Sequence, residues 1–170
     1  MDRDDLLAAL AAVGQQLLHR GLQGDLYVVG GAAMALAYDR ERTTRDVDDL
    51  FAPKQAVYAA AAVVAADRGL EPDWLNDAAK GYLLGPDRGT TEVLDLPGLR
   101  VEVASAETVL VMKALAHRRG DETDARLLAA QLGLDAERAL DLVERVAGER
   151  WLTPQVQFFV QAVLEPGVEG

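Results

Sequence analysis

Cysteine is absent from the sequence, and histidine occurs only twice, as His19 and His117. Without a thiol there can be no disulfide bond, thiolate metal site or cysteine nucleophile. Two histidines are also too few for the three-histidine metal centres found in some enzymes. Any chemistry that this chain performs is therefore expected to do without cysteine and without a multi-histidine metal site.

Positive charge is scarce as well. The 170 residues include 17 Lys+Arg and 28 Asp+Glu, so the formal net charge is −11 and the pI is about 4.5. Nucleic-acid surfaces depend on clustered Lys and Arg, so a broad non-specific surface is not expected, although a small basic cleft is compatible with this composition. Only three lysines occur (54, 80 and 113). Because arginine is the usual basic residue in this chain, each lysine is a candidate for a specific role.

We expect neither a targeting leader nor a membrane-spanning segment in this sequence. Its first five residues are Met-Asp-Arg-Asp-Asp, which is acidic where a signal peptide is basic. The longest apolar candidate, 56–66, falls short of the roughly 18–20 residues that a membrane span needs. We expect a cytoplasmic protein with no membrane partner.

Helical and extended patterns alternate in the first 104 residues. Helical spacing at 4–19 and apolar runs at 26–29 and 47–52 predict a helix and two strands. We further predict helices at 32–38, from Pro53 to about Arg68, and within 71–84, a loop at 39–46, a turn at 85–89, and strands at 91–96 and 99–104 joined by Pro97-Gly98.

From Ser105 onward the pattern is helical throughout. Ser105 is a natural N-cap, and amphipathic segments follow, separated by Gly133, Gly148 and Pro154. Three aromatic residues in the last helices are expected to serve packing: Trp151, Phe158 and Phe159. The predicted class is α+β, with an α/β core at 1–104, a C-terminal helical region at 105–170 packed on it, and a frayed tail from Pro166.

One stretch, VVGGAAMALAYDRERTTRDVDDLF at 28–51, suggests chemistry. Asp46 and Asp48 are two residues apart, so on a strand they face the same side and can share divalent cations such as Mg²⁺. Gly30 and Gly31 lack Cβ atoms and precede a helix, which lets the backbone approach a phosphate. Together these features suit phosphoryl or nucleotidyl transfer.

Each part alone has a simpler explanation. A Gly-Gly pair before a helix is most often just a turn, and Asp-x-Asp arises by chance in so acidic a chain, the more easily because Asp49 follows. The ordered combination of strand, Gly-Gly, helix, loop and Asp-x-Asp is far more specific.

That order resembles the signature of the polymerase-beta-like nucleotidyltransferase superfamily. A second segment, VLVMKALAHRRGDETD at 109–124, is similar to the Lys-x-x-Ala…Arg…Asp-x-x-Asp block of the AbiEii/MenT-type nucleotidyltransferase toxins, with a shorter spacer between Lys113 and Asp121 and with Gly120-Asp121 in place of an Arg-Asp pair. WLND at 74–77 looks like a small bacterial branch of the group. The resemblance implies a small mixed sheet flanked by helices and followed by a helical bundle.

The resemblance also implies roles for individual residues. Asp46 and Asp48 would hold Mg²⁺, with Mn²⁺ as a possible substitute, and Gly30-Gly31 would line the triphosphate. Lys113 would contact a phosphate of the bound nucleotide, and Asp124 would be an essential acid.

Other positions keep two interpretations. Arg45 would bind phosphate or be an ordinary surface arginine, and Lys113 lies on an apolar helix where it would either snorkel to solvent or find an anion. Many such folds use a third carboxylate as a metal ligand. Glu102 is the candidate, with Asp95 as its rival and a solvent-facing acid as the alternative.

The predicted function is transfer of a nucleoside monophosphate from an NTP to an acceptor hydroxyl with release of pyrophosphate. The resemblance implies that the acceptor is the 3′ end of tRNA, bound through a local basic cleft. It also implies that the protein is a toxin with a cognate antitoxin protein. The alternatives are a small-molecule, antibiotic-type nucleotidyltransferase and a catalytically inactive binding protein of the same fold.

Overall fold

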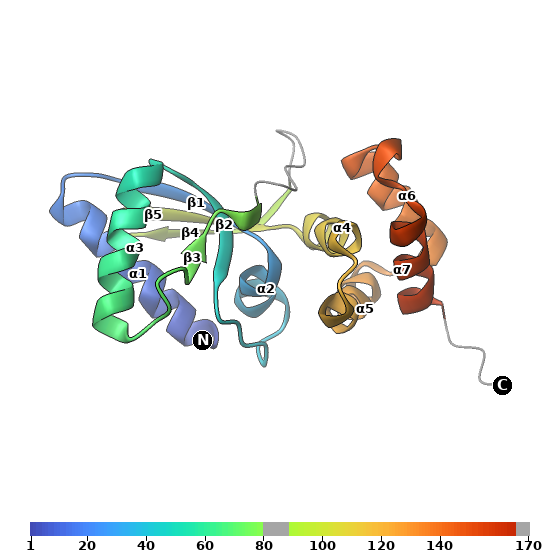
Figure 1. Cartoon of the computed structure of the whole chain (residues 1–170), viewed down its shortest axis with the longest axis horizontal. Helices are drawn as coiled ribbons and strands as arrows, with labels where there is room; N and C mark the ends of the chain where they lie inside the picture. Colours follow the sequence, from blue (N-terminus) through green and yellow to red (C-terminus); the bar gives the residue numbers. More distant parts are fainter. Residues whose placement is uncertain (80–88, 166–170) are drawn as a thin grey trace. The chain divides into compact units, whose positions relative to one another are not determined.

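The computed structural model describes residues 1–79 and 89–165 (Figure 1). Within this part of the chain there are two compact units. One comprises 1–79 and 90–104 and is an α/β unit; the other comprises 89 and 105–165 and is helical.

The α/β unit contains a five-stranded mixed sheet with the order β3-β2-β1-β5-β4. Strand β1 is antiparallel to β2 and parallel to β5, β2 is parallel to β3, and β4 is antiparallel to β5. The sheet together with the helices confirms the predicted α+β class. The strands are β1 (Gly24–Val28), β2 (Val47–Ala52), β3 (Leu75–Asn76), β4 (Thr90–Leu96) and β5 (Leu99–Ala104).

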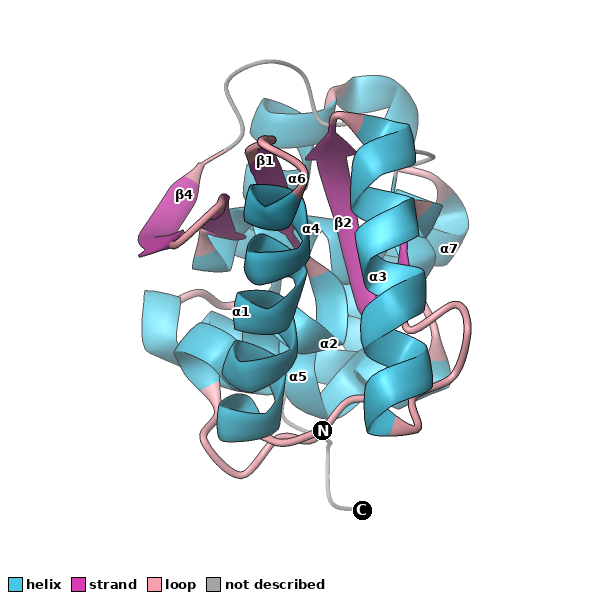
Figure 2. Cartoon of the chain, turned by 90° about the vertical axis from the view of Figure 1, so that its left-hand side faces the viewer, coloured by secondary structure: helices cyan, strands magenta, loops and turns pink. Residues whose placement is uncertain are grey.

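Two long helices cover one face of this sheet. Helix α1 (Arg3–His19) begins with a capping box between Asp2 and Asp5, and α3 (Lys54–Arg68) ends at Gly69 in the left-handed region. Figure 2 shows α1 and α3 side by side over β1 and β2, and their residues are in contact. Most positions of β1 and β5 are buried, as expected for central strands of a covered sheet.

Between β1 and β2 the chain forms one short helical segment. It begins as α2 (Gly30–Ala33) and continues as a π-helical turn at Met34–Tyr38. The predicted helix at 32–38 is therefore present, but it starts two residues earlier, at the glycine pair. The Tyr38 hydroxyl donates to the carbonyl oxygen of Ala104 at 2.5 Å, which ties the end of this segment to the end of β5.

The prediction of a helix within 71–84 is wrong for 71–77, whereas residues 78 and 79 have 3-10 helical conformation. Leu75 and Asn76 instead form β3, paired with Val47 and Asp48 of β2. Trp74 is fully buried, and its Nε1 donates to the carbonyl oxygen of Ala61 at 3.0 Å. This tertiary contact and the edge of β2 override the local helix preference. Residues 80–84 and most of the predicted 85–89 turn lie outside the described residues.

The helical unit consists of four α-helices joined by short turns. Ser105 caps α4 through a bond from the Thr108 amide at 3.2 Å, as predicted, and Asp135 and Thr153 cap the third and fourth helices in the same way. The tail from Pro166 lies outside the described residues. The helices are α4 (Ala106–Ala116), α5 (Glu122–Leu132), α6 (Ala136–Ala147) and α7 (Pro154–Leu164). Among the described residues, no helix is long and apolar enough to cross a membrane.

Candidate active site

Gly30 and Asp48 lie against each other at the end of β1. A Cβ atom placed on Gly30 would be 3.3 Å from Asp48 Oδ2, and Gly30 has a φ of +61°, a conformation that glycine adopts without strain. The Val29 amide donates to the carbonyl oxygen of Asp48 at 3.0 Å, so the antiparallel pairing extends to this point. Because Gly30 has no side chain, the Asp48 carboxylate can lie close to its backbone.

Gly31 adjoins the loop that leads into β2. A Cβ atom there would lie 3.1 Å from Thr44 Oγ1 and 3.9 Å from Arg42 Nη2. Asp46 is exposed and immediately precedes β2, so only Asp48 of the predicted Asp-x-Asp pair is within the strand. Arg45 is exposed beside it. The glycine pair, Asp48 and the Asp46 loop are thus gathered at one end of the sheet.

Glu102, the candidate third carboxylate, lies further along the same face. Glu102 is opposite Tyr27 on one side of β1, and Asp48 is paired with Val29 on the other side. Strand β1 therefore separates the two acids, which are offset by two residues along it. Glu102 accepts from Thr90 Oγ1 at 3.3 Å and pairs with Arg100 Nη2 at 3.3 Å. Its rival Asp95 has a side chain 84% exposed, with its Oδ1 3.9 Å from Arg100 Nε.

Asp49 is the residue whose environment the sequence analysis missed. It is fully buried, and neither carboxylate oxygen accepts a hydrogen bond from the residues that the structure describes. Burial, and then the nearby charges of Asp48 and Asp77, raise the pKa of this carboxyl to about 9. Strand alternation was the available signal, because Asp49 shares its face with buried Val47.

Asp77 is held at the surface by α3. Its carboxylate accepts from Lys54 Nζ at 2.6 Å and from the Tyr58 hydroxyl at 2.9 Å, and hydrogen bonding to Asp77 raises the pKa of Lys54. Phe51 packs edge-on against the Tyr58 ring with centroids 4.8 Å apart. This cluster fastens the segment after β3 to the start of α3.

In the helical unit, Lys113 is buried between two carboxylates. Its Nζ lies 2.7 Å from Asp121 Oδ1 and 2.8 Å from Asp124 Oδ2, and its side chain is 6% exposed. The lysine therefore finds its anions within the protein, on the turn and helix that follow α4. Asp124 is 3% exposed, so this is a buried ionic cluster and not a pair of surface salt bridges.

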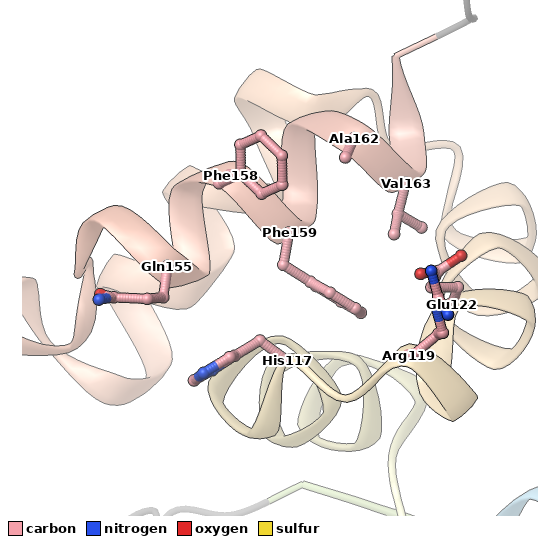
Figure 3. Close-up of a pocket in the computed structure, with 8 residues that line it drawn as sticks. All are labelled: His117, Arg119, Glu122, Gln155, Phe158, Phe159, Ala162 and Val163. Carbon is pink, nitrogen blue, oxygen red and sulfur yellow. The ribbon is translucent and has the colours of Figure 1, made fainter.

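A small pocket of about 280 Å³ occurs elsewhere in the helical unit (Figure 3). Phe159 is 8% exposed and points toward the segment that carries His117 and Arg119, whereas Phe158 points away and is 73% exposed. The expectation of packing is confirmed for Phe159 and wrong for Phe158. The residues that line the pocket are His117, Arg119, Glu122, Gln155, Phe158, Phe159, Ala162 and Val163.

The donors near Gly30 decide which metal ion could bind there. Among the described residues, no cluster of three or more His, Asp or Glu side chains is arranged to hold one. Mg²⁺, however, commonly takes only one or two protein carboxylates and completes its shell with water and substrate phosphates. Asp48 beside the Gly30 backbone, with Asp46 exposed two residues earlier, fits that requirement.

The comparisons with known proteins add no family assignment. No protein-family model, no curated protein and no solved structure matches the chain.

Proposed function

We propose that the chain is a Mg²⁺-dependent nucleotidyltransferase that uses the end of the sheet formed by Gly30 and Asp48. The observation that carries this proposal is the contact between them, which sets a carboxylate against a backbone with no side chain. A triphosphate can approach such a backbone closely, and a metal held by the carboxylate would neutralise its charge.

The reaction needs positioning and charge neutralisation more than covalent chemistry by the protein. Asp46 and Asp48 would hold the ion, and the backbone of Gly30 and Gly31 would line the triphosphate. The acceptor hydroxyl oxygen bonds to the α-phosphorus while the bond to the pyrophosphate oxygen breaks, and the hydroxyl proton is released. When bound, Mg²⁺ offsets the negative charge that develops on the phosphate oxygens.

We propose the 3′ end of tRNA as the acceptor and a toxin, paired with an antitoxin in the cytoplasm, as the biological role. Both rest on the resemblance of 28–51 and 109–124 to the AbiEii/MenT-type toxins. Arg42 and Arg45 supply positive charge in the loop next to the glycine pair. The Lys113 ammonium already pairs with two carboxylates in the helical unit. Its contact with a nucleotide phosphate stays a prediction.

A small-molecule acceptor is the second candidate. The net charge of −11 favours it, since proteins that bind tRNA usually present a basic track. Growth inhibition on expression that is relieved by Asp48→Asn would favour the toxin. Transfer to a small hydroxylated molecule without effect on growth would favour the second candidate.

Labelled NTPs test the reaction directly. The protein would be incubated with Mg²⁺, each α-labelled NTP and total tRNA, beside Asp48→Asn and the control Asp25→Asn, which removes an exposed carboxylate from β1. We expect labelled tRNA with wild type and Asp25→Asn and none with Asp48→Asn. Absence of transfer to tRNA and to small acceptors, together with Mn²⁺ and NTP binding unchanged in Asp48→Asn, would refute the proposal.

A further inference from the structure

Thr44 is tethered at three points in the loop between the π-helical turn and β2. Its backbone amide donates to the carbonyl oxygen of Met1 at 3.0 Å, and its own carbonyl oxygen accepts from the Met1 nitrogen at 2.6 Å. Its hydroxyl donates to the carbonyl oxygen of Asp46 at 2.9 Å. Backbone and side chain of one residue are thus fixed at the same time.

The side chain of Thr44 also rests on the glycine pair. A Cβ atom on Gly31 would lie 3.1 Å from Thr44 Oγ1 and 3.6 Å from Thr44 Cβ. Because Gly31 has no side chain, Thr44 can pack directly on its backbone. The hydroxyl therefore connects two parts of the proposed site, the glycine pair on one side and the Asp46 backbone on the other.

Met1 and Arg3 form hydrogen bonds with the chain on both sides of this loop. Arg3 Nε donates to the carbonyl oxygen of Leu36 at 3.0 Å, just before the loop, while Met1 bonds to Thr44 near its end. Asp39 closes the intervening turn by accepting from the Glu41 amide at 3.0 Å. Met1 and Arg3 thus hold the chain on both sides of residues 39–43.

We propose that Thr44 is the positioning residue that holds Asp46 beside the glycine pair, within reach of an ion bound at Asp48. This inference rests on the proposed function. In this role Thr44 acts by restraining the backbone of a predicted metal ligand. Displacing a catalytic group by about 1 Å can lower the rate on the order of 100-fold. We therefore expect loss of the Thr44 hydroxyl to have a measurable effect.

Three substitutions separate this role from simple packing. Thr44→Val keeps the branched shape and removes the hydroxyl, Thr44→Ser keeps the hydroxyl, and Thr43→Val makes the same change at the exposed neighbouring threonine. In Thr44→Val we expect Mn²⁺ affinity, measured by calorimetry, to fall about 5-fold, the equivalent of one lost hydrogen bond. Trypsin should cleave faster after Arg42 and Arg45. Thr44→Ser and Thr43→Val should behave like wild type in both assays.

The outcomes distinguish the two proposals. If Asp48→Asn loses Mn²⁺ binding while Thr44→Val keeps wild-type affinity and trypsin resistance, the positioning role of Thr44 is overturned and the proposed function stands. Equal losses in Thr44→Val and Thr43→Val would also overturn it. If neither Asp48→Asn nor Thr44→Val alters Mn²⁺ binding, the proposed function fails and the positioning role fails with it.

Discussion

Replacing Asp49 with asparagine should stabilise the protein, and increasingly so as the pH rises. The pKa of this carboxyl is about 9 in the folded protein, against an ordinary value of 3.8. Because the folded-state value is raised, the unfolded chain releases this proton above pH 3.8 while the folded protein retains it to about pH 9. Stability is therefore lost progressively across that interval.

The magnitude follows from the size of the shift. Each pH unit between the two values costs about 1.4 kcal/mol, so at pH 7 the retained proton lowers the free energy of unfolding by roughly 4 kcal/mol. That is a large part of the total stability of a typical folded domain, which is about 5–15 kcal/mol. The asparagine variant would carry no such pH-dependent cost, because its side chain does not titrate.

Urea unfolding at pH 5, 6, 7 and 8 with EDTA present measures the effect. The difference in unfolding free energy between Asp49→Asn and wild type should grow by about 4 kcal/mol over these three units. Asp25→Asn removes a carboxylate that is exposed on the neighbouring strand and should show no comparable trend. A difference that stays flat with pH for Asp49→Asn would refute the reasoning.

Three further outcomes are expected. Gly30→Ala should destabilise by about 1–2 kcal/mol because φ is +61°, and should weaken NTP binding by crowding Asp48; unchanged NTP affinity in calorimetry would contradict the second effect. Lys113→Met should cost about 3–5 kcal/mol in urea unfolding, and adding Asp124→Asn should recover part of it, whereas additive losses would contradict an ionic cluster. Phe158→Ser should change stability by less than about 0.5 kcal/mol, because its ring is 73% exposed, and a drop in Tm of several degrees would show that it packs.

Elements with local signals could be predicted from the sequence. The Ser105 cap, the end of the Pro53 helix near Arg68 and the Pro97-Gly98 hairpin turn each depend on a neighbouring residue's conformation or hydrogen bond, and all three occur as predicted. Strand β3 could not be foreseen, because its two residues depend on pairing with β2 and on the burial of Trp74, and neither leaves a local sequence signal.

Only part of the candidate site could be predicted from the sequence. The order of strand, glycine pair, helix and strand leads β2 back beside β1, which is why Asp48 could be associated with Gly30 from sequence. The contacts of Thr44 with Met1 could not, since they join residues 43 positions apart through backbone atoms that carry no sequence signal. The pairing of Lys113 with Asp121 and Asp124 also had to await the structure, because the turn after α4 decides where the two acids point.

The buried Lys113 cluster constrains how this chain can vary. One ammonium group faces two carboxylates in a setting that is nearly closed to water, so loss of the ammonium leaves two buried carboxylates without a counter-charge. Natural variants that lose the lysine should therefore also lose a neighbouring acid: a neutral residue at 113 should be accompanied by a neutral residue at 124. Such linked substitution would be visible in an alignment of relatives without any measurement on the protein itself.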